Sequence, residues 1–402
     1  MPWALKLKKG FKLAANTGSQ VNDLNAGKLL GRAADLVPIL KSRAAHNEEL
    51  RRVPDETVQD VLSAGLYRIG VPPRFGGLDV DYSLVLDVGM ELGRGCGSSS
   101  WCYSVWAVHG CMVGHWALQA QEEVFAGGPE VLISSSLNNG TSRADSVSGG
   151  YRVTGHWEFS SGCDAAGWVM LGVEGIGERS WALIPRSDFE IVDNWFVSGL
   201  RGTGSKDIVV EDAFVPAHRV LDVNRAGDGD WTGWEIHGQD RYRMPIPVLL
   251  GWDLVAPMIG IAQGMIDEFT ARLIGTSGPG KTAESPAIQI RLSEAAAEVD
   301  AARVFLRHDI REMFDKAKAG ESFAPLERAR YRRDKAFITQ LCLRSVNRLF
   351  DLSGGHALFD SSSLQRFHRD AHAVSHRDGL IMELGGSQYG KVALGLEADG
   401  RI

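Results

Sequence analysis

A short segment that ends in two serines and a glycine offers the clearest chemistry in this sequence. Residues 151–163 read YRVTGHWEFSSGC, in which β-branched and aromatic residues favour a strand and the small residues favour its end. The hydroxyl groups of Ser160 and Ser161, next to the indole of Trp157, could bind a flat polar heterocycle by hydrogen bonding and stacking. A Ser-Gly turn that closes a hairpin would use the same residues, so the segment by itself leaves both interpretations open.

Three histidines near the C-terminus, His368, His372 and His376, repeat at four-residue spacing. On a continuous helix they would form one stripe, which resembles part of a metal site. His368 and His376 would then lie about 12 Å apart, too far for one ion with ligand bonds of about 2 Å. We predict no metal site, and either a hydrogen-bonded stripe or a ligand contact by His376 would explain the spacing.

A glycine-rich stretch, residues 200–207 (LRGTGSKD), is a second candidate for ligand binding. Its glycines permit close approach of the backbone, and Arg201 and Ser205 could bind an anion, although a simple turn would have the same composition. The sequence contains neither a GxGxxG motif after a predicted strand nor a GxxxxGKS/T motif. We therefore predict neither a Rossmann dinucleotide site nor a P-loop.

The periodicity of apolar residues divides the chain into three units that must position these segments. Residues 21–128 repeat apolar positions at three- and four-residue spacing, which predicts helices. Residues 129–225 change to short runs of period two, which predicts about six to eight strands, and residues 226–402 return to helical spacing. Residues 1–20 are basic without an apolar core or a cleavage site, so we expect a leader or loose arm rather than a signal peptide.

Charge and cysteine content exclude several classes of protein. The 43 basic and 50 acidic residues give a net charge of −7, which does not favour binding of nucleic acid. The five cysteines are odd in number and lack CxxC spacing, which favours a reducing compartment. No uncharged apolar run of about 18 residues is present, so a membrane span is not predicted. We therefore expect a cytoplasmic protein.

Several motifs occur together in an order that resembles the acyl-CoA dehydrogenase superfamily, over about residues 25–395. Each motif is weak alone, whereas their shared order and spacing are specific. The resemblance implies an α+β fold with an N-terminal helical domain, a central β-barrel or β-sandwich domain and a C-terminal four-helix bundle. The motifs are VPPRFGGL (71–78), GHWEFSSG (155–162), LRGTGSKDIVVEDAFVP (200–216), SGGHALF (353–359) and RFHRDAHAVSH (366–376).

Two branches of this superfamily perform different chemistry. Acyl-CoA dehydrogenases have a glutamate base just before a glycine. In this sequence the dipeptide that resembles it is Asp378-Gly379, so the usual glutamate is absent. A shorter side chain moves the base by about 1 Å, which can lower the rate by about a hundredfold. A dehydrogenase or oxidase with Asp378 as base is therefore disfavoured but stays open, as does a non-catalytic flavin-binding protein.

The sequence resembles more closely the branch of reduced-flavin-dependent monooxygenases, which includes the oxygenase components of 4-hydroxyphenylacetate and other phenol hydroxylases. This resemblance implies a flavin that is reduced by a separate NAD(P)H-dependent reductase. The oxygenase would bind reduced FMN or FAD with O2, form a C4a-hydroperoxyflavin and transfer one oxygen atom to an aromatic, phenolic substrate. The segments that carry this resemblance are residues 95–110, 132–137, 156–164 and 369–376.

Two residues match family positions at the substrate. The resemblance implies that His109 contacts the phenolic oxygen, where an ordinary pKa of about 6.5 would let it take or share a proton at neutral pH. It also implies that Ser135 helps to hold the substrate hydroxyl, with Ser134 and Ser136 on the other face of a strand. A hydrogen-bonded core histidine and a plain polar strand are the alternatives at these positions.

Other residues match family positions at the flavin. The resemblance implies that Ser160 lies near flavin N5 with Ser161 beside it, and that His376 lies near the flavin edge, where it could position the peroxide or assist proton transfer. Trp157 could form part of the wall around the ring, although core packing would explain it equally well.

Contacts further from the ring are expected from both this subunit and a neighbour. Arg201 and Ser205 would bind the phosphate or ribityl part of the cofactor, and Arg291 matches a position that approaches the flavin of a neighbouring subunit. The resemblance implies a homotetramer, formed as a dimer of dimers, which would bury apolar helix surface.

Overall fold

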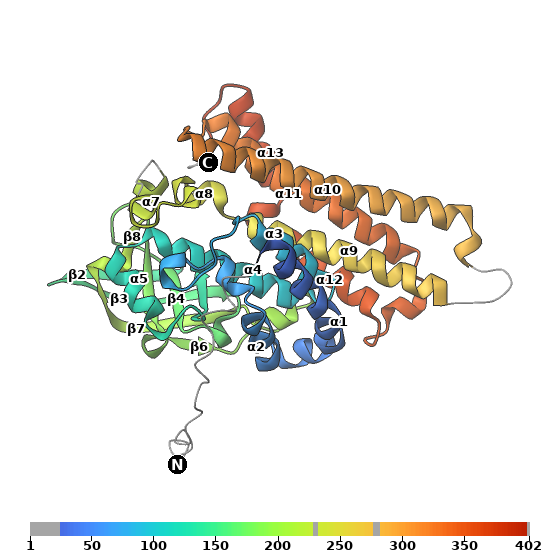
Figure 1. The fold of residues 1–402 in the computed structure, drawn as a ribbon, viewed down its shortest axis with the longest axis horizontal. Coiled ribbons are helices and arrows are strands. Elements are labelled where there is room, and N and C mark those ends of the chain that lie inside the picture. Colours follow the sequence, from blue (N-terminus) through green and yellow to red (C-terminus); the bar gives the residue numbers. More distant parts are fainter. Residues whose placement is uncertain (1–24, 228–231, 276–281, 400–402) are drawn as a thin grey trace, which may run out of the picture.

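The computed structural model describes residues 25–227, 232–275 and 282–399 (Figure 1). The basic arm expected at residues 1–20 lies outside the described residues. The first part of the described chain is helical, and its five helices are α1 (Ala26–Leu50), α2 (Asp55–Ser63), α3 (Leu84–Gly93), α4 (Gly97–Met112) and α5 (Leu118–Val124).

Helix α4 is the central helix of this part. All of its 16 residues are buried, because α4 packs against α3, against a later helix, α9 (Trp252–Gly275), and against the first strand, β1 (Ile133–Ser136). Close helix packing requires small residues where backbones approach. A Cβ at Gly93 of α3 would lie 2.8 Å from the Cα of Gly260 in α9, so glycine permits this crossing. Helix α4 therefore presents its side chains to a fully packed environment.

The middle of the chain forms two four-stranded sheets, with strand orders β1-β4-β5-β8 and β2-β3-β7-β6. Strand β1 runs parallel to β4, and the other neighbouring strands pair antiparallel. The remaining strands are β2 (Thr141–Val147), β3 (Gly150–Ser160), β4 (Trp168–Val173), β5 (Ser180–Pro185), β6 (Glu190–Val192), β7 (Lys206–Pro216) and β8 (Val220–Asp222).

The end of β3 departs from regular pairing with β7. The register shifts between Trp157 and Ser160, as at a β-bulge, and Phe159 between them has a positive φ of 65°. A bulge reverses the alternation of side chains. Phe159 is therefore 58% exposed, whereas Trp157 and Ser160 are fully buried.

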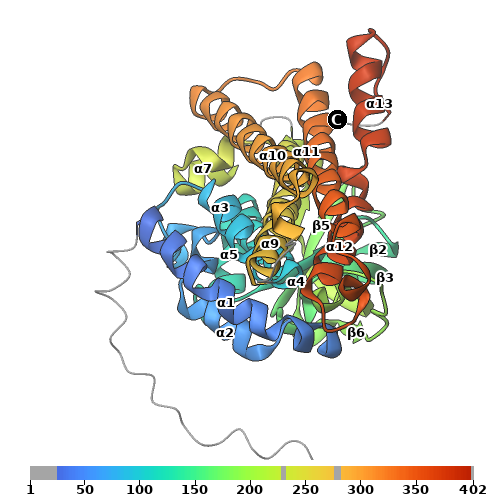
Figure 2. The ribbon, with the colours of Figure 1, turned by 90° about the vertical axis from the view of Figure 1, so that its right-hand side faces the viewer.

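The last part of the chain is helical again. Figure 2 shows α10, α11 and α13 standing beside one another, with α9 and α12 closer to the rest of the molecule. This order of helices, sheets and helices confirms the predicted α+β arrangement. The helices are α6 (Val223–Gly227), α7 (Thr232–His237), α8 (Ile246–Leu249), α9, α10 (Pro286–Ala319), α11 (Pro325–Asp351), α12 (Ser363–Ser375) and α13 (Met382–Ala393).

One stretch, Ile246–Gly275, is long and apolar enough to cross a membrane by length and composition. However, 72% of its most apolar window is buried inside the protein, where α9 packs against α3, α4, α11 and α12. Helices that are apolar on all sides are expected in the core of a large protein. This stretch is therefore a core helix.

Candidate active site

His109 and Ser135 form a hydrogen-bonded pair between α4 and β1. His109 is 3% exposed, and its Nδ1 lies 2.9 Å from the carbonyl oxygen of Ile133, while its Nε2 lies 2.9 Å from Oγ of Ser135. A carbonyl oxygen can only accept, so Nδ1 carries the hydrogen atom. In the neutral imidazole Nε2 must then accept the hydroxyl hydrogen of Ser135.

Burial determines the protonation state of this pair. Desolvation lowers the pKa of His109 to about 4, although the bond to the Ile133 carbonyl acts in the opposite direction. His109 is therefore neutral at pH 7, and its pKa lies below the ordinary value of about 6.5 that was expected, so that sharing a proton fits this site better than taking one up. Because the hydrogen of Ser135 is held by His109, the oxygen of this partly exposed serine remains free to accept a hydrogen bond.

The serines on either side of Ser135 face β3, as strand alternation predicts. Ser134 Oγ lies 3.1 Å from Ser160 Oγ, and Ser136 Oγ donates to the carbonyl oxygen of Glu158 at 2.8 Å. Ser134 and Ser160 are both fully buried. The hydroxyl of Ser160 is thus directed into the protein, toward β1.

Ser161, Thr203 and Ser205 form a connected set that we call the hydroxyl chain. Trp101 Nε1 lies 3.1 Å from Ser161 Oγ, and Ser161 and Thr203 each lie 2.7 Å from Ser205 Oγ. Thr203 donates to the carbonyl oxygen of Leu200 at 2.8 Å. Since the Thr203 hydrogen is thereby used, Ser205 must donate to Thr203, and Ser161 to Ser205. The chain of donors therefore runs from Trp101 to Leu200.

Glycines allow the backbone around the hydroxyl chain to approach closely. Gly162 and Gly204 have φ of 70° and 52°, in the left-handed region that favours glycine. A Cβ at Gly162 would lie 2.5 Å from Nε1 of Trp106, which donates to the Gly162 carbonyl at 3.2 Å. The exposed ring of Phe159 lies nearby in sequence, 6.1 Å from the ring of Trp195. Neutral hydroxyl groups, and an exposed aromatic ring two residues before Ser161, are groups of the kind that can contact the uncharged heteroatoms and flat shape of a flavin ring.

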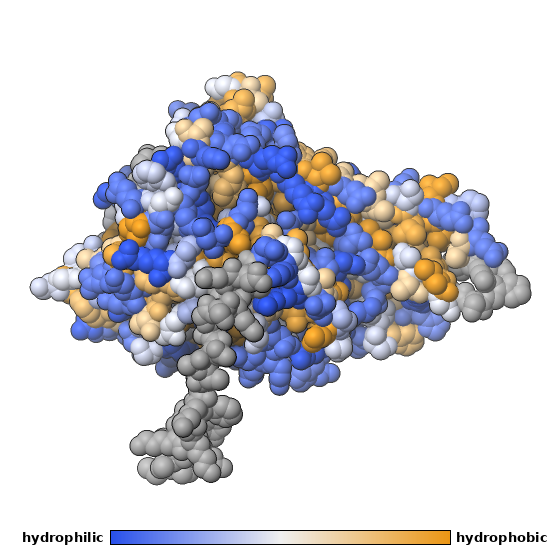
Figure 3. All heavy atoms as spheres, viewed as in Figure 1, coloured by the Kyte–Doolittle hydropathy of each residue, from blue (hydrophilic) through white to orange (hydrophobic). Residues whose placement is uncertain are grey.

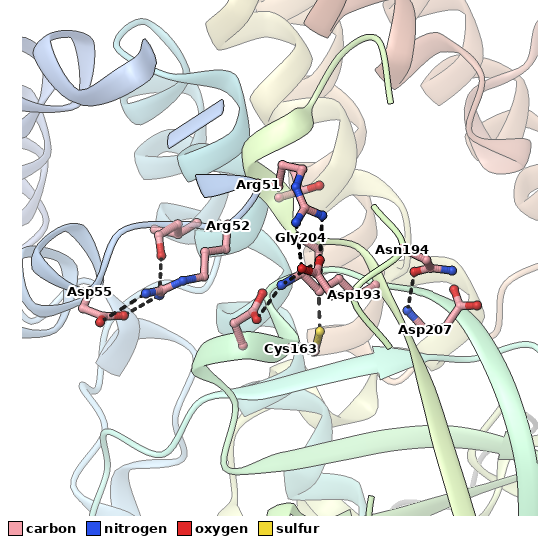
Figure 4. Close-up of polar contacts among 12 residues, drawn as sticks. Arg51, Arg52, Asp55, Cys163, Asp193, Asn194, Gly204 and Asp207 are labelled. Carbon is pink, nitrogen blue, oxygen red and sulfur yellow. Dashed lines mark hydrogen bonds and ion pairs between the residues drawn. The ribbon is translucent and has the colours of Figure 1, made fainter. Parts of the chain in front are cut away.

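A network of ion pairs anchors this glycine-rich loop to α1 (Figure 4). Lys206 is 6% exposed, and its Nζ lies 2.8 Å from Asp164 Oδ1 and 3.4 Å from Asp193. Arg51, at the end of α1, forms a two-pronged contact with the carboxylate of Asp193 at 2.6 and 2.7 Å. A buried lysine held by two carboxylates is strongly positioned, so the start of β7 is fixed relative to α1.

Trp157 does not belong to the site. Its side chain is fully buried in the core of the two sheets, and its Nε1 donates to the carbonyl oxygen of Gly172 at 2.7 Å. A ring enclosed in this way has no face for a cofactor. The expectation that Trp157 forms part of the wall around the flavin is therefore wrong, and core packing explains this residue.

His376 directly follows α12, and its hydrogen bonds are with residues of α12 and not with His109 or Ser135. It is exposed, and its Nδ1 lies 2.7 Å from the carbonyl oxygen of His372, so Nδ1 donates and Nε2 is an acceptor in the neutral ring. His372 Nε2 contacts Asn347 at 2.8 Å, and the ring of His368 stacks on Phe350. The histidine stripe is thus engaged in local contacts, which include a ring contact of 4.5 Å between His368 and His372.

Of the two predicted arginine contacts, Arg201 lies in the same turn as a member of the hydroxyl chain, whereas Arg291 is distant from that chain in the sequence and has its ion pair elsewhere. Arg201 is exposed in the turn Arg201–Thr203, two residues from Thr203. Arg291 is exposed near the start of α10 and pairs with Glu294 at 2.8 Å. Helix α10 begins at the end of the helical layer that points away from the sheets (Figure 1). The structure therefore does not bring Arg291 into the group of residues around the hydroxyl chain.

Two residues that the structure connects to the site, Trp101 and Asp370, were not among the predicted site residues. Trp101 donates to the hydroxyl chain from the helix that carries His109. Its position about two helical turns before His109 was the available signal. Asp370 accepts from the Leu200 amide, and it lies in the motif RFHRDAHAVSH, in which only His376 was predicted as a site residue.

Comparison with known proteins identifies relatives of this chain. The family model described as acyl-CoA dehydrogenase, N-terminal domain, matches residues 37–126, and the model described as acyl-CoA dehydrogenase, C-terminal domain, matches residues 253–378. The flavin-dependent monooxygenase oxygenase subunit HsaA of Mycobacterium tuberculosis is 35% identical and aligns over 88% of this chain and 92% of its own length. The FADH2-dependent resorcinol hydroxylase oxygenase component of a Rhizobium strain is 31% identical, over 93% and 96%.

A solved structure supports the same relationship. The crystal structure of 3-HSA hydroxylase from Rhodococcus sp. RHA1 superposes with a TM-score of 0.88 at 34% identity, and covers 93% of this chain and 98% of that one. This match confirms the predicted acyl-CoA dehydrogenase-like fold. The chain therefore belongs to the family of acyl-CoA dehydrogenase-fold oxygenase components of two-component flavin-dependent monooxygenases.

Proposed function

We propose that this protein uses reduced flavin and O2 to hydroxylate an aromatic substrate that carries a phenolic hydroxyl. The observation that carries the proposal is the His109–Ser135 pair, in which a neutral imidazole holds the serine hydrogen and leaves the serine oxygen as an acceptor. A phenol would donate its hydrogen to this oxygen. The relatives named as resorcinol hydroxylase and 3-HSA hydroxylase support this class of substrate.

Hydrogen bonding by Ser135 would orient and activate the substrate. A phenol that donates to Ser135 has a more electron-rich ring and presents a fixed edge to the oxidant. The bound flavin supplies two electrons and O2 supplies the transferred atom, so that reduced flavin, O2 and the arene give oxidised flavin, the hydroxylated arene and water. The protein contributes orientation, exclusion of water and placement of protons.

The hydroxyl chain is our proposed contact for the flavin ring. Ser161 and Ser205 offer oxygen atoms that could accept hydrogen bonds from ring N–H groups of the reduced flavin, while the exposed Arg201 would bind the phosphate. Ser160 acts in this proposal through its bond to Ser134, next to Ser135. His376, with Nδ1 held by a carbonyl, would use Nε2 to accept or deliver a proton at the flavin edge.

We further propose that the protein works in the cytoplasm with a separate NAD(P)H-dependent flavin reductase, and that it accepts reduced FMN or FAD. The names of its relatives as oxygenase subunits and components support a reductase. Five unpaired, buried cysteines support a reducing compartment.

The proposed assembly is a homotetramer built as a dimer of dimers. Apolar surface gathers over the region where α9 ends and α10 begins (Figure 3). Ile274 is 76% exposed and Ile290 is 57% exposed there, which favours burial against another copy. Arg291, one residue further along α10, would then approach the flavin of that copy.

Turnover with isotopically labelled O2 tests the function. Protein loaded with reduced flavin under anaerobic conditions is mixed with labelled O2 and a panel of phenols, and the product and hydrogen peroxide are measured. We expect one labelled oxygen atom in the product of at least one phenol. Flavin binding that yields hydrogen peroxide with every phenol would contradict the proposal and favour a non-catalytic flavin-binding protein.

A further inference from the structure

Leu200 holds an unusual backbone conformation at the start of the glycine-rich loop. It is a non-glycine residue with φ of 51°, and its side chain is 5% exposed. A left-handed conformation is unfavourable for leucine and persists only where the surrounding structure determines it. The hydrogen bonds of the Leu200 amide and carbonyl oxygen therefore indicate which groups maintain this conformation.

Both polar groups of Leu200 have buried partners of different kinds. Its amide donates to Oδ1 of Asp370 at 2.7 Å, over a sequence separation of 170 residues. Its carbonyl oxygen accepts from the hydroxyl of Thr203 at 2.8 Å, the final bond of the hydroxyl chain. Leu200 thus joins the carboxyl group of Asp370 on α12 to the hydroxyl chain and, through it, to Trp101 on α4.

Neighbouring contacts hold the same loop against α12. Arg369 donates to the carbonyl oxygen of Ser198 and to Glu48 of α1, with a distance of 2.7 Å to Glu48. A Cβ at Gly199 would lie 2.1 Å from the carbonyl oxygen of Arg369, so only glycine allows this approach. The three residues before the turn Arg201–Thr203 are therefore fixed by two consecutive residues of α12.

The second oxygen of Asp370 faces α4. A Cβ at Gly97, the first residue of α4, would lie 2.9 Å from Oδ2. Asp370 is 2% exposed, and burial raises the pKa of its carboxyl group to about 7. Placing a carboxyl group in such an environment is unfavourable. Its bond to the Leu200 amide partly offsets this effect.

We propose that Asp370 is a positioning residue that acts through the Leu200 peptide to set the hydroxyl chain at the distance and orientation needed by the reduced flavin. Its link to the flavin rests on the proposed function. Its link to the loop rests on geometry alone. The two parts can therefore be tested separately.

Substitution of Asp370 tests the link to the flavin. In D370A the Leu200 amide loses its acceptor, and we expect the dissociation constant of reduced flavin and the ratio of hydrogen peroxide to product each to rise about tenfold. D370N keeps an acceptor oxygen, so it should recover most of this loss and remain within about threefold of the wild type. Wild-type binding and coupling in D370A would overturn the proposal.

Asp253 provides a matched control. It is 5% exposed and accepts from the Gly251 amide at 2.9 Å, so D253A removes the same kind of buried bond outside the loop. We expect D253A to lower stability without changing coupling. Equal loss of coupling in D253A and D370A would reduce the role of Asp370 to general stability and overturn the proposal.

A double-mutant cycle with Thr203 gives a second test of the same link. D370A and T203V should be non-additive in flavin affinity, because each removes a bond to the Leu200 peptide. Additive effects would contradict the inference. Hydrogen exchange of the amides of residues 200–205 gives a flavin-independent measurement, and we expect faster exchange in D370A than in D253A. If this difference appears but the wild type oxygenates no phenol, the proposed function fails and the positioning role stands.

Discussion

Two buried polar clusters in this protein differ in how their polar atoms are bonded. In the hydroxyl chain, Ser161, Thr203 and Ser205 pass hydrogen bonds from an indole to a carbonyl oxygen. Between α10 and α11, Asp309 and Asp334 are fully buried, and neither carboxylate oxygen of Asp309 has a hydrogen-bond partner among the described residues.

Because both clusters are buried, burial of polar groups alone does not mark an active site. Desolvation and the neighbouring Asp334 raise the pKa of Asp309 to about 7, so this carboxyl group is sensitive to pH. The hydroxyl chain is neutral and directional and is anchored from two helices, by Trp101 of α4 and, through Leu200, by Asp370 of α12. Catalysis needs a cluster of the kind that the hydroxyl chain represents, because the positions of the reacting groups must be fixed before the reaction begins.

The largest expected effect in this comparison comes from His109→Asn. Loss of the imidazole that holds the Ser135 hydrogen should lower the yield of hydroxylated product by about a hundredfold, a typical loss for one positioned hydrogen-bonding group. The affinity for reduced flavin should change little. Coupled product formation and flavin binding are measured together, with His115→Asn as a control for a buried histidine, 4% exposed, just after the same helix. Unchanged product yield would remove His109 from the mechanism.

Asp309→Asn should have the largest effect in the other cluster, and on stability rather than on product. Because the folded-state pKa of Asp309 is raised to about 7, the native protein binds this proton more tightly than the unfolded chain. The contribution of this bound proton to the free energy of unfolding is therefore fully present below about pH 4, and it is lost as the pH rises through about 7. Asparagine does not titrate, so the variant does not show this loss. The free energy of unfolding of the variant minus that of the wild type should therefore be larger at pH 8 than at pH 5, by on the order of 2 kcal/mol.

Denaturant unfolding at the two pH values measures this difference. Asp315→Asn, at an exposed position of α10, is the control for a change of charge on the same helix. A gain that is the same at pH 5 and pH 8 would show that Asp309 is not protonated in the folded state, and the contrast between the two clusters would lose its electrostatic basis.

The difference between the clusters also explains which parts of the molecule could be predicted from the sequence. Helical and strand periodicity predicted the order of helices and sheets, and motif order predicted the family. The side chains near the Ser-Ser-Gly end were harder, because the bulge between Trp157 and Ser160 reverses the strand alternation. Phe159 is exposed and Trp157 buried for this reason.

Long-range contacts and local solvation were beyond the sequence pattern. The bond between Leu200 and Asp370 spans 170 residues, and no local spacing indicates it. The pairing of His109 with Ser135 was implied by family resemblance, whereas the low pKa of His109 depends on enclosure by other segments. Sequence patterns report which face of an element is apolar, but not how deeply a polar residue is finally enclosed.

Paired substitutions of Ser160 and Ser161 compare two neighbouring hydroxyl groups at the end of β3. Ser161 belongs to the hydroxyl chain, whereas Ser160 is directed toward Ser134. We expect Ser161→Ala to raise the ratio of hydrogen peroxide to product about fivefold, and Ser160→Ala less than about twofold, since the loss of one hydrogen bond to a neutral group is modest. The ratio is measured with saturating reduced flavin. A larger effect of Ser160→Ala would restore Ser160 as the residue next to the flavin ring.

The smallest effect is expected at Asp378, an exposed carboxylate in the short turn Asp378–Leu380. It belongs to neither buried cluster, and solvent screens its charge, so Asp378→Asn should change oxygenation by less than about twofold. A dehydrogenase that used Asp378 as its base would instead bind oxidised flavin and lose its colour on addition of an acyl thioester. Anaerobic titration of the wild type and the variant distinguishes these mechanisms. Bleaching that occurs in the wild type and disappears in Asp378→Asn would mean that the exposed acid, and not the buried His109–Ser135 pair, carries the chemistry of this fold.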